Sequence, residues 1–282
     1  MIDFSLNRLY QVAGLSKQAV AQARRRYELL ESRLELLLVE IDELRALQPG
    51  CGVEKMYYTL RPGFLGRDRF INLVMQLGYR LKINYVRPKT TRPGNYYYPN
   101  LIEGKTFCHP NEVWQSDITY YEVNERFYYL TFLIDIYTKV VVGYAVSDHM
   151  RAEANLYALN MALERFGYPK VHHSDRGSQY LYKPYLNQLK DKQTQVSMGL
   201  IGQENAFAER INGTIKNEYL RYRNINSFAE LKRWTKQAVT DYNERRIHNH
   251  IGRKAPLDFL AEYQSGNIQE QYNVFVPIFT TQ

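Results

Sequence analysis

The chain has 282 residues and is 45% hydrophobic and 14% aromatic, which excludes a single small domain and an intrinsically disordered protein. Its net charge of +8 is unevenly distributed: residues 1–105 carry 17 Lys and Arg against 10 Asp and Glu, residues 106–209 carry 9 against 12, and residues 210–254 carry 11 against 4. Basic flanks around an acidic middle are typical of a protein that holds a polyanion beside a cation site, and a high pI without such a role is the simpler alternative.

Cysteine content and hydropathy indicate the cellular compartment in which the protein is expected. The two cysteines, Cys51 and Cys108, are far apart and form no CxxC motif, so neither a disulfide framework nor a zinc knuckle is predicted. The first residues lack the charged and apolar regions of a signal peptide, and the most apolar helical run is too short to span a membrane. We therefore expect a cytoplasmic protein without a membrane partner.

The N-terminal part predicts an all-helical region. Residues 6–26 have the pattern of a small helix-turn-helix, with Gly14 in the turn and Ser16 capping the second helix, and this pattern fits DNA binding or plain packing. The second helix continues to Leu47 with apolar residues alternately four and three apart, which fits self-association or packing within the chain. The seam consists of Ala23, Tyr27, Leu30, Leu34, Leu37, Ile41 and Leu44.

Composition shifts divide the chain into five predicted segments. Prolines and tyrosines make a basic connection that is unsuited to regular structure. The predicted segments are residues 1–48 (helix-turn-helix and long helix), 49–82 (a second small helical DNA-binding unit), 83–110 (the connection), 111–264 (a catalytic core with a C-terminal basic helix) and 265–282 (a tail without an assignable pattern).

The predicted core alternates between strands and helices. Its first three strand-like runs are VWQSDITYYEV, FYYLTFLIDIY and KVVVGYAV, joined by short connections. The elements expected after them are a helix at 151–166, a strand at 170–174, a helix near 182–190, a strand near 194–198, a helix from about 205 and a basic helix at 228–248. The order βββαβαβα predicts an α/β fold of the ribonuclease-H-like class, a mixed five-stranded sheet flanked by helices.

Three acidic residues in these elements are candidates for chemistry. Asp117 lies inside the first strand, Asp175 directly follows the fourth, and Glu209 lies on the next helix. Carboxylates on packed elements supply the oxygen ligands that Mg²⁺ prefers, and a pair of such ions serves the cutting and joining of phosphodiester bonds. Each residue taken alone is ordinary, so the prediction depends on the three side chains meeting in space.

The local contexts of these residues resemble a known family. WQSDITYY, HHSDRGSQY and NAFAERINGTIKNEYL resemble, in this order, the catalytic signatures of insertion-sequence transposases of the IS-three family, whose DDE core is shared with retroviral integrases. RRIHNHIGRKAPLDFL resembles that family's C-terminal end, and the N-terminal helices resemble its helix-turn-helix segments. By this match Asp117, Asp175 and Glu209 are the catalytic, metal-binding triad. The 33 residues between Asp175 and Glu209 are two fewer than is usual, and the shortfall falls in the loop GLIGQEN.

The resemblance implies a DNA transposase that cleaves and transfers strands with two Mg²⁺ ions, for which Mn²⁺ can substitute. Its implied partners are double-stranded DNA (terminal inverted repeats and target), a second copy of the chain on DNA, and an upstream-frame product fused by frameshifting. Its implied location is the nucleoid of a bacterium. Two alternatives stay open: a ribonuclease-H-like nuclease without strand transfer, and a non-catalytic DNA-binding regulator from a decayed element.

Basic and amide side chains are candidates for DNA contacts, with a solvated surface as the plain alternative. In the helical units and the connection they are Lys17, Arg24, Arg25, Arg26, Arg67, Arg69, Arg87, Lys89 and Arg92. In the core they are Asn205, Arg210, Asn212, Lys216, Arg245 and Arg246. A structural role is expected for Asp135, a fourth core acid. For His172 and His173, which precede Asp175, we expect that they orient the strand end, with proton transfer near the metal ions as the alternative.

Overall fold

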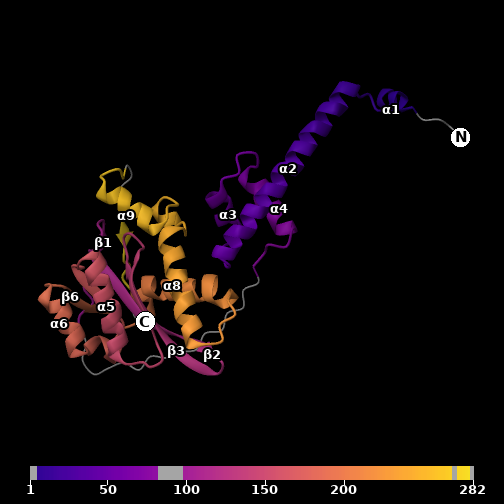
Figure 1. The fold of residues 1–282 in the computed structure, drawn as a ribbon. Helices are drawn as coiled ribbons and strands as arrows, with labels where there is room; N and C mark the ends of the chain where they lie inside the picture. The colour runs from indigo at the N-terminus through magenta and orange to yellow at the C-terminus, as the bar shows by residue number, and fades with distance from the viewer. Residues whose placement is uncertain (1–4, 82–97, 269–271, 280–282) are drawn as a thin grey trace. The chain divides into compact units, whose positions relative to one another are not determined.

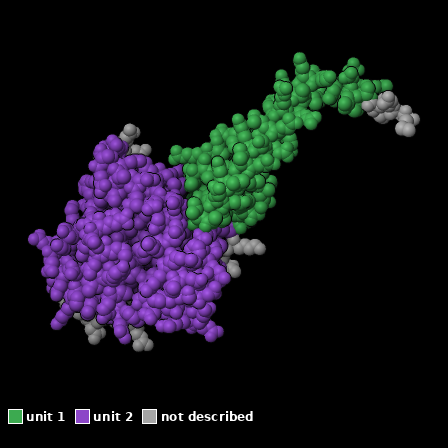
Figure 2. Space-filling model, in the orientation of Figure 1, with its two compact units in different colours: residues 1–47, 52–80 green, residues 48–51, 81–282 purple. Residues whose placement is uncertain are grey.

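The computed structural model of the chain describes residues 5–81, 98–268 and 272–279, which form two compact units (Figures 1 and 2). Unit 1 comprises residues 1–47 and 52–80, and unit 2 comprises residues 48–51 and 81–282. The predicted Pro- and Tyr-rich connection falls largely on residues 82–97, outside the described residues. Within the described ranges, no helix has the length and apolar character needed to cross a membrane.

Unit 1 is helical, as its sequence pattern predicts. Gly14 adopts a left-handed φ of 65° in the turn, and Ser16 Oγ accepts a hydrogen bond from Ala19 N at 3.0 Å, so the predicted turn and cap are confirmed. The predicted heptad seam is buried only in part, because Ile41 is fully buried whereas Tyr27 is 67% exposed. The described helices of this unit are α1 (Leu6–Val12), α2 (Lys17–Leu47), α3 (Val53–Leu60) and α4 (Arg67–Gln76).

Unit 2 is built on a mixed five-stranded sheet, which confirms the predicted ribonuclease-H-like layout (Figure 1). The strand order is β4-β3-β2-β5-β6. The first three strands form an antiparallel meander, and β5 and β6 run parallel to β2. The strands are β2 (Val113–Val123), β3 (Arg126–Asp135), β4 (Val141–Ser147), β5 (Val171–Ser174) and β6 (Gln195–Met198).

Helices cover both faces of this sheet because alternate strand residues point to opposite sides. Phe132 belongs to the apolar cluster with Ile211 of α7 and Leu231 of α8, whereas the neighbouring Leu133 belongs to the cluster with Leu159 of α5. The helices are α5 (Ala152–Phe166), α6 (Lys183–Asp191), α7 (Ala206–Thr214), α8 (Phe228–Glu244) and α9 (Pro256–Gln264).

The tail, for which the sequence suggested no assignment, returns to the core. Strand β7 (Val274–Phe275) pairs antiparallel with β1 (Thr106–Phe107). Val276 is buried in a cluster with Ile102, and its carbonyl accepts a hydrogen bond from Gly104 N. The tail is therefore part of unit 2 rather than an appendage.

Gly143 marks the closest approach between the sheet and α5. A Cβ at Gly143 would lie 2.1 Å from the carbonyl oxygen of Ala158, a backbone atom that cannot rotate away. We predict that Gly143→Ala lowers the free energy of unfolding by about 3 kcal/mol or more, because it overpacks the interface. Gly213→Ala, on α7, meets only Asn217 Nδ2 at 3.9 Å and should be neutral or stabilising. Chemical denaturation of both variants checks this, and equal stability would contradict it.

Candidate active site

Two carboxylates meet where β2 and β5 run side by side. Ser116 of β2 pairs in parallel register with Ser174 of β5, so Asp117 and Asp175 are the next residues on neighbouring strands. Burial, the charge of Asp175 and then the charge of Glu209 raise the pKa of Asp117 to about 8. Burial also raises the pKa of Asp175. Both carboxyl groups are thus largely shielded from water, and the doubly ionised state of the pair is unfavourable because the two charges repel each other.

Glu209 lies on the exposed side of α7, near this pair. Its charge contributes to the raised pKa of Asp117, so the two carboxylates act on each other. A Cβ at Gly202 would lie 2.2 Å from Glu209 Oε1, which shows that the carboxylate rests against the backbone of the preceding loop. Over the described ranges, no three His, Cys, Asp or Glu side chains are gathered closely enough to hold a metal ion. At the described positions, the three carboxylates are thus not gathered into one cluster, although the charge of Glu209 is among the causes that raise the pKa of Asp117.

The pair fits a hard divalent cation in its chemistry. Asp117 Oδ2 accepts a hydrogen bond from Asn212 Nδ2 at 2.8 Å, and Asp175 Oδ1 accepts one from Gly177 N at 3.0 Å. Each carboxylate is thereby oriented by a donor, while repulsion between the pair favours a cation that would offset both charges. Oxygen ligands of this kind are those that Mg²⁺ prefers.

Two amides predicted to contact DNA instead hold α7 against β2. Asn205 is 2% exposed, and its Nδ2 donates to the carbonyl oxygen of Ser116 at 2.9 Å. Asn212 is also buried, and it donates to Asp117. The prediction of DNA contacts is wrong for these two residues, because their donors are engaged inside the protein. Lys216 is half-buried and donates to Thr119 Oγ1 at 2.8 Å, beside the same strand.

Arg246 is a second correction. It is 8% exposed and donates from Nε and Nη2 to the two carboxylate oxygens of Glu218, both at 2.8 Å, so it does not face DNA. Glu218 belongs to a π-helical segment, Ile215–Tyr219, that continues α7, and its carbonyl accepts a hydrogen bond from Gly50 N. The sequence did not single out Glu218, since an acid on a basic helix has no distinguishing pattern.

The other residues predicted to contact DNA are either exposed or outside the described residues. Arg245 is exposed and forms an ion pair with Asp241. Exposed side chains at described positions are Lys17, Arg24, Arg25, Arg26, Arg67, Arg69 and Arg210. Arg87, Lys89 and Arg92 lie outside the described residues. An aromatic support not foreseen from the sequence lies on α8, where the guanidinium groups of Arg223 and Arg233 lie 4.3 and 4.9 Å from the ring centroid of Trp234.

The histidines before Asp175 are buried and neutral. His172 Nε2 lies 2.8 Å from Tyr185 Oη, and burial together with His173 lowers the pKa of His172 to about 3. His173 Nδ1 lies 2.8 Å from Ser197 Oγ, and burial lowers its pKa to about 4. Both rings orient the end of β5, as expected. Tyr180, which the sequence did not single out, is also buried, with its hydroxyl oxygen 2.9 Å from Ser116 Oγ.

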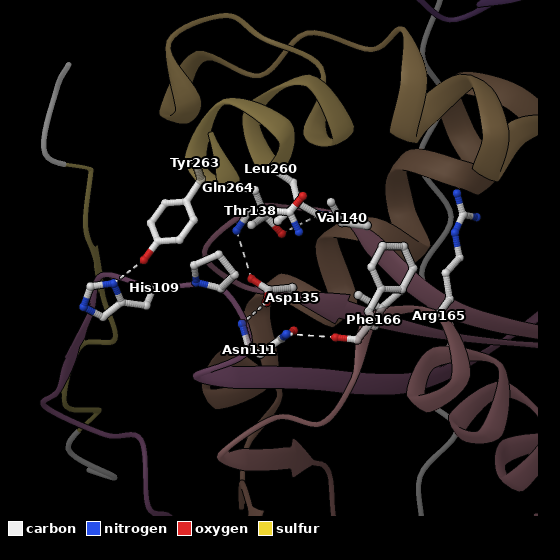
Figure 3. A pocket seen from close by; sticks show the side chains of 12 residues that line it. His109, Asn111, Asp135, Thr138, Val140, Arg165, Phe166, Leu260, Tyr263 and Gln264 are labelled. Atoms are coloured by element: carbon white, nitrogen blue, oxygen red, sulfur yellow. Dashed lines mark hydrogen bonds between the residues drawn. The ribbon is translucent and has the colours of Figure 1, made fainter. Parts of the chain in front are cut away.

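Asp135 has the expected structural role and lines a separate pocket of about 320 Å³ (Figure 3). Its Oδ1 accepts hydrogen bonds from Tyr137 N and Thr138 N, and its Oδ2 accepts one from Asn111 N, so it holds the turn after β3. Across the pocket, the hydroxyl of Tyr263 points at the ring of His109, with its oxygen 2.6 Å from Nδ1 (Figure 3).

Comparisons with known proteins identify the fold and the family. Two integrase core domain families match residues 108–203 and 194–256. The simian T-cell lymphotropic virus intasome, solved with the PP2A regulatory subunit B56 gamma, is 15% identical with a TM-score of 0.50, over 85% of this chain and 80% of that one. The HTLV-2 integrase catalytic core domain in complex with magnesium is 20% identical with a TM-score of 0.45, over 57% of this chain and 98% of that one. The sheet and its flanking helices define an integrase-type core.

Relatives in bacteria narrow this class. An uncharacterized 31 kDa protein of insertion element IS600 from Shigella sonnei is 34% identical over 71% of this chain and 76% of its own length. A putative transposase of IS986/IS6110 from Mycobacterium tuberculosis is 30% identical over 76% of this chain and 75% of its own length. The IS629 transposase of Shigella sonnei is 36% identical over 55% of this chain and 53% of its own length. The chain belongs to the IS-three (IS3) family of insertion-sequence transposases.

The buried His172 generates a prediction about pH. Its folded-state pKa lies below the ordinary value of about 6.5, so the unfolded chain takes up a proton first as pH falls, and stability is lost between about pH 6.5 and pH 3. His172→Gln removes this titration. We predict that the stability advantage of the wild type over this variant shrinks by up to about 1.4 kcal/mol for each pH unit below 6. Urea unfolding at pH 7, 6 and 5 measures it, and a constant difference would contradict it.

The part-buried ion pair between Arg246 and Glu218 generates a prediction about stability. Arg246→Met removes the bidentate partner of Glu218, and we predict a loss of about 1.5–3 kcal/mol in the free energy of unfolding. Lys236→Met, at an exposed position of the preceding helix α8, should change the free energy of unfolding by about 0.5 kcal/mol or less. Denaturant titration compares the two. Equal, small effects would show that Arg246 is a solvated surface residue after all.

Proposed function

We propose that this transposase cleaves DNA strands at the ends of an insertion sequence and joins them to a target, with Asp117, Asp175 and Glu209 as its catalytic triad. The observation that carries the proposal is the register of β2 and β5, in which Asp117 and Asp175 directly follow the paired residues Ser116 and Ser174. The charge of Glu209 is in addition among the causes that raise the pKa of Asp117. Family membership supports the same reaction.

The three carboxylates are the residues that would hold two Mg²⁺ ions, or Mn²⁺ in their place. Such ions, when bound, supply activation of the attacking oxygen and stabilisation of the leaving oxygen at a phosphodiester. The protein's part is to orient the carboxylates. Asn212 holds one oxygen of Asp117, and Gly177 N holds one oxygen of Asp175. Closure of Glu209 onto the pair belongs to the proposal, since that carboxylate rests against Gly202 here.

The proposed reaction consists of two displacements on DNA. Water first cuts the strand and leaves a 3′-hydroxyl at the element's end. The oxygen of this hydroxyl then bonds to phosphorus in the target strand, the bond to the target's own 3′-oxygen breaks, and that oxygen takes up a proton. No covalent bond to the enzyme forms. The exposed Arg and Lys side chains of unit 1, together with Arg210 of α7 and Arg245 at the end of α8, are proposed to contact phosphates.

The proposal also covers the oligomeric form, a fusion partner and the location in the cell. Two DNA ends must be held together for transfer, so the working form on DNA is at least a dimer. An upstream-frame product fused by frameshifting, and a location on the bacterial nucleoid, follow the family. The rival functions are a nuclease that hydrolyses without joining, and a DNA-binding regulator without cleavage.

Substitution of one carboxylate tests the triad. We predict that Asp175→Asn lowers both cleavage and strand transfer by at least about 100-fold, more than the loss of an outer-shell partner usually costs. Asp258→Asn, the same change at an exposed position of α9, should leave both unchanged. The assay uses DNA carrying the element's ends, with and without a pre-cut 3′-hydroxyl, in Mg²⁺.

Each rival has its own outcome in this assay. Hydrolysis without any joined product from the pre-cut end favours the nuclease. Binding of the same DNA without cleavage, and with no effect of Asp175→Asn, favours the regulator.

A further inference from the structure

Gln115 of β2 makes contacts at the start of α7 that no part of the proposed chemistry uses. Its side chain is fully buried, at 0% exposure. Its Oε1 accepts hydrogen bonds from Phe207 N at 3.0 Å and from Ala208 N at 3.3 Å, and its Nε2 donates to the carbonyl oxygen of Glu204 at 3.3 Å. Oε1 is thus engaged with the first turn of α7, some ninety positions away, and Nε2 with the 3-10 helical segment Gly202–Asn205 directly before it.

The first turn of α7 needs such a partner. The first amide groups of a helix have no acceptor within the helix, and a side chain at the N-cap usually supplies one. The N-cap of α7 is Asn205, whose side chain makes no capping bond and donates instead to the carbonyl of Ser116. The acceptor for Phe207 and Ala208 therefore comes from the strand. The side-chain acceptor at the start of α7 is therefore Gln115 of β2 and not the N-cap residue.

Gln115 is the first of a series of contacts along one face of β2. Gln115, Asp117 and Thr119 are two apart and share that face, and they meet the amide of Ala208 and the side chains of Asn212 and Lys216. Two strand residues advance about 6.7 Å and four helical residues about 6 Å, so each step along the strand meets the next helical turn. Strand and helix are thereby held in register.

We propose that Gln115 is a positioning residue that sets the place of Glu209 relative to Asp117. Glu209 directly follows Ala208, whose amide Gln115 holds. The α7 helix has nine residues, too few to be stable without outside contacts. Without Gln115, its first turn loses an acceptor for two amides, whereas Ile211, further along the helix, stays packed in the apolar core. The effect falls on Glu209 rather than on the fold. The inference rests on the proposed function only in its activity readout.

Two substitutions in the full chain separate this role from general packing. Gln115→Met keeps the approximate size but offers no acceptor. Gln115→Glu keeps an acceptor that a helix N-terminus favours, although it cannot donate to the Glu204 carbonyl. Hydrogen exchange of the Phe207 and Ala208 amides is measured without metal, and DNA affinity and the Mg²⁺ dependence of cleavage are measured on the same variants.

Gln115→Met should exchange these two amides at least about 10-fold faster, cleave about 10–100-fold more slowly and need more Mg²⁺ for half-maximal rate, with DNA affinity unchanged. Gln115→Glu should restore protection and most of the rate. If Gln115→Met does not fold, Gln115→Asn, which shortens the reach by one carbon, takes its place with the same expectations.

Wild-type protection and Mg²⁺ dependence in Gln115→Met would overturn the proposal. So would faster exchange spread evenly over unit 2, which would assign Gln115 to general packing. If the wild type cleaves no DNA, the proposed function fails, and the exchange of Phe207 and Ala208 still decides the positioning role.

Discussion

The structure depends on one constraint, the need to satisfy polar groups buried between β2 and α7. A buried amide or carboxylate without a partner is costly, so hydrogen bonds across this interface favour a helix that offers matching donors, although the side-chain oxygens of Asn205 and Asn212 are buried there without a partner among the described residues. Asn205 and Asn212 supply such groups for Ser116 and Asp117. The same contacts that make this interface stable therefore bring the element carrying Glu209 to the strand carrying Asp117.

Electrostatics sets what this arrangement can do. Asp117 and Asp175 are placed as neighbours by strand register, and their partial burial makes the doubly ionised pair unfavourable. A protein built only for stability would not retain such a pair, whereas a site that takes up a divalent cation gains from it. Glu209 rests against the loop before α7, where a Cβ at Gly202 would lie 2.2 Å from Glu209 Oε1.

Much of this fold could be predicted because its signals are local. The run at residues 113–123 was predicted as a strand and is β2 with the same bounds, since its β-branched and aromatic residues and its short following turn are read directly. The pairing of β1 with β7 could not be predicted, because it joins short segments that are far apart in the chain. Each of these two strands has only two residues, too few to show a period.

The roles of several site residues could not be predicted for the same reason, because they depend on contacts between distant segments. Residue type alone does not separate Arg245, which is exposed, from Arg246, which is buried against Glu218, because the difference depends on which side of a helix end faces the π-helical segment. Amides such as Asn205 can bind either a phosphate or a backbone carbonyl. Gln115 could have been noticed in the sequence, because it is a polar residue in a strand expected to be buried. Its hydrogen-bond partners on α7 could be identified only from the structure.

The central claim is that Asp117, Asp175 and Glu209 share divalent cations. The most direct measurement is anomalous diffraction from crystals of the protein grown with Mn²⁺. We predict a peak at about 2.1 Å from carboxylate oxygens of both Asp117 and Asp175, with Glu209 drawn toward it, and the loss of that peak in Asp175→Asn. A wild-type crystal with no peak between the two aspartates, or a peak that persists unchanged in the variant, would contradict it.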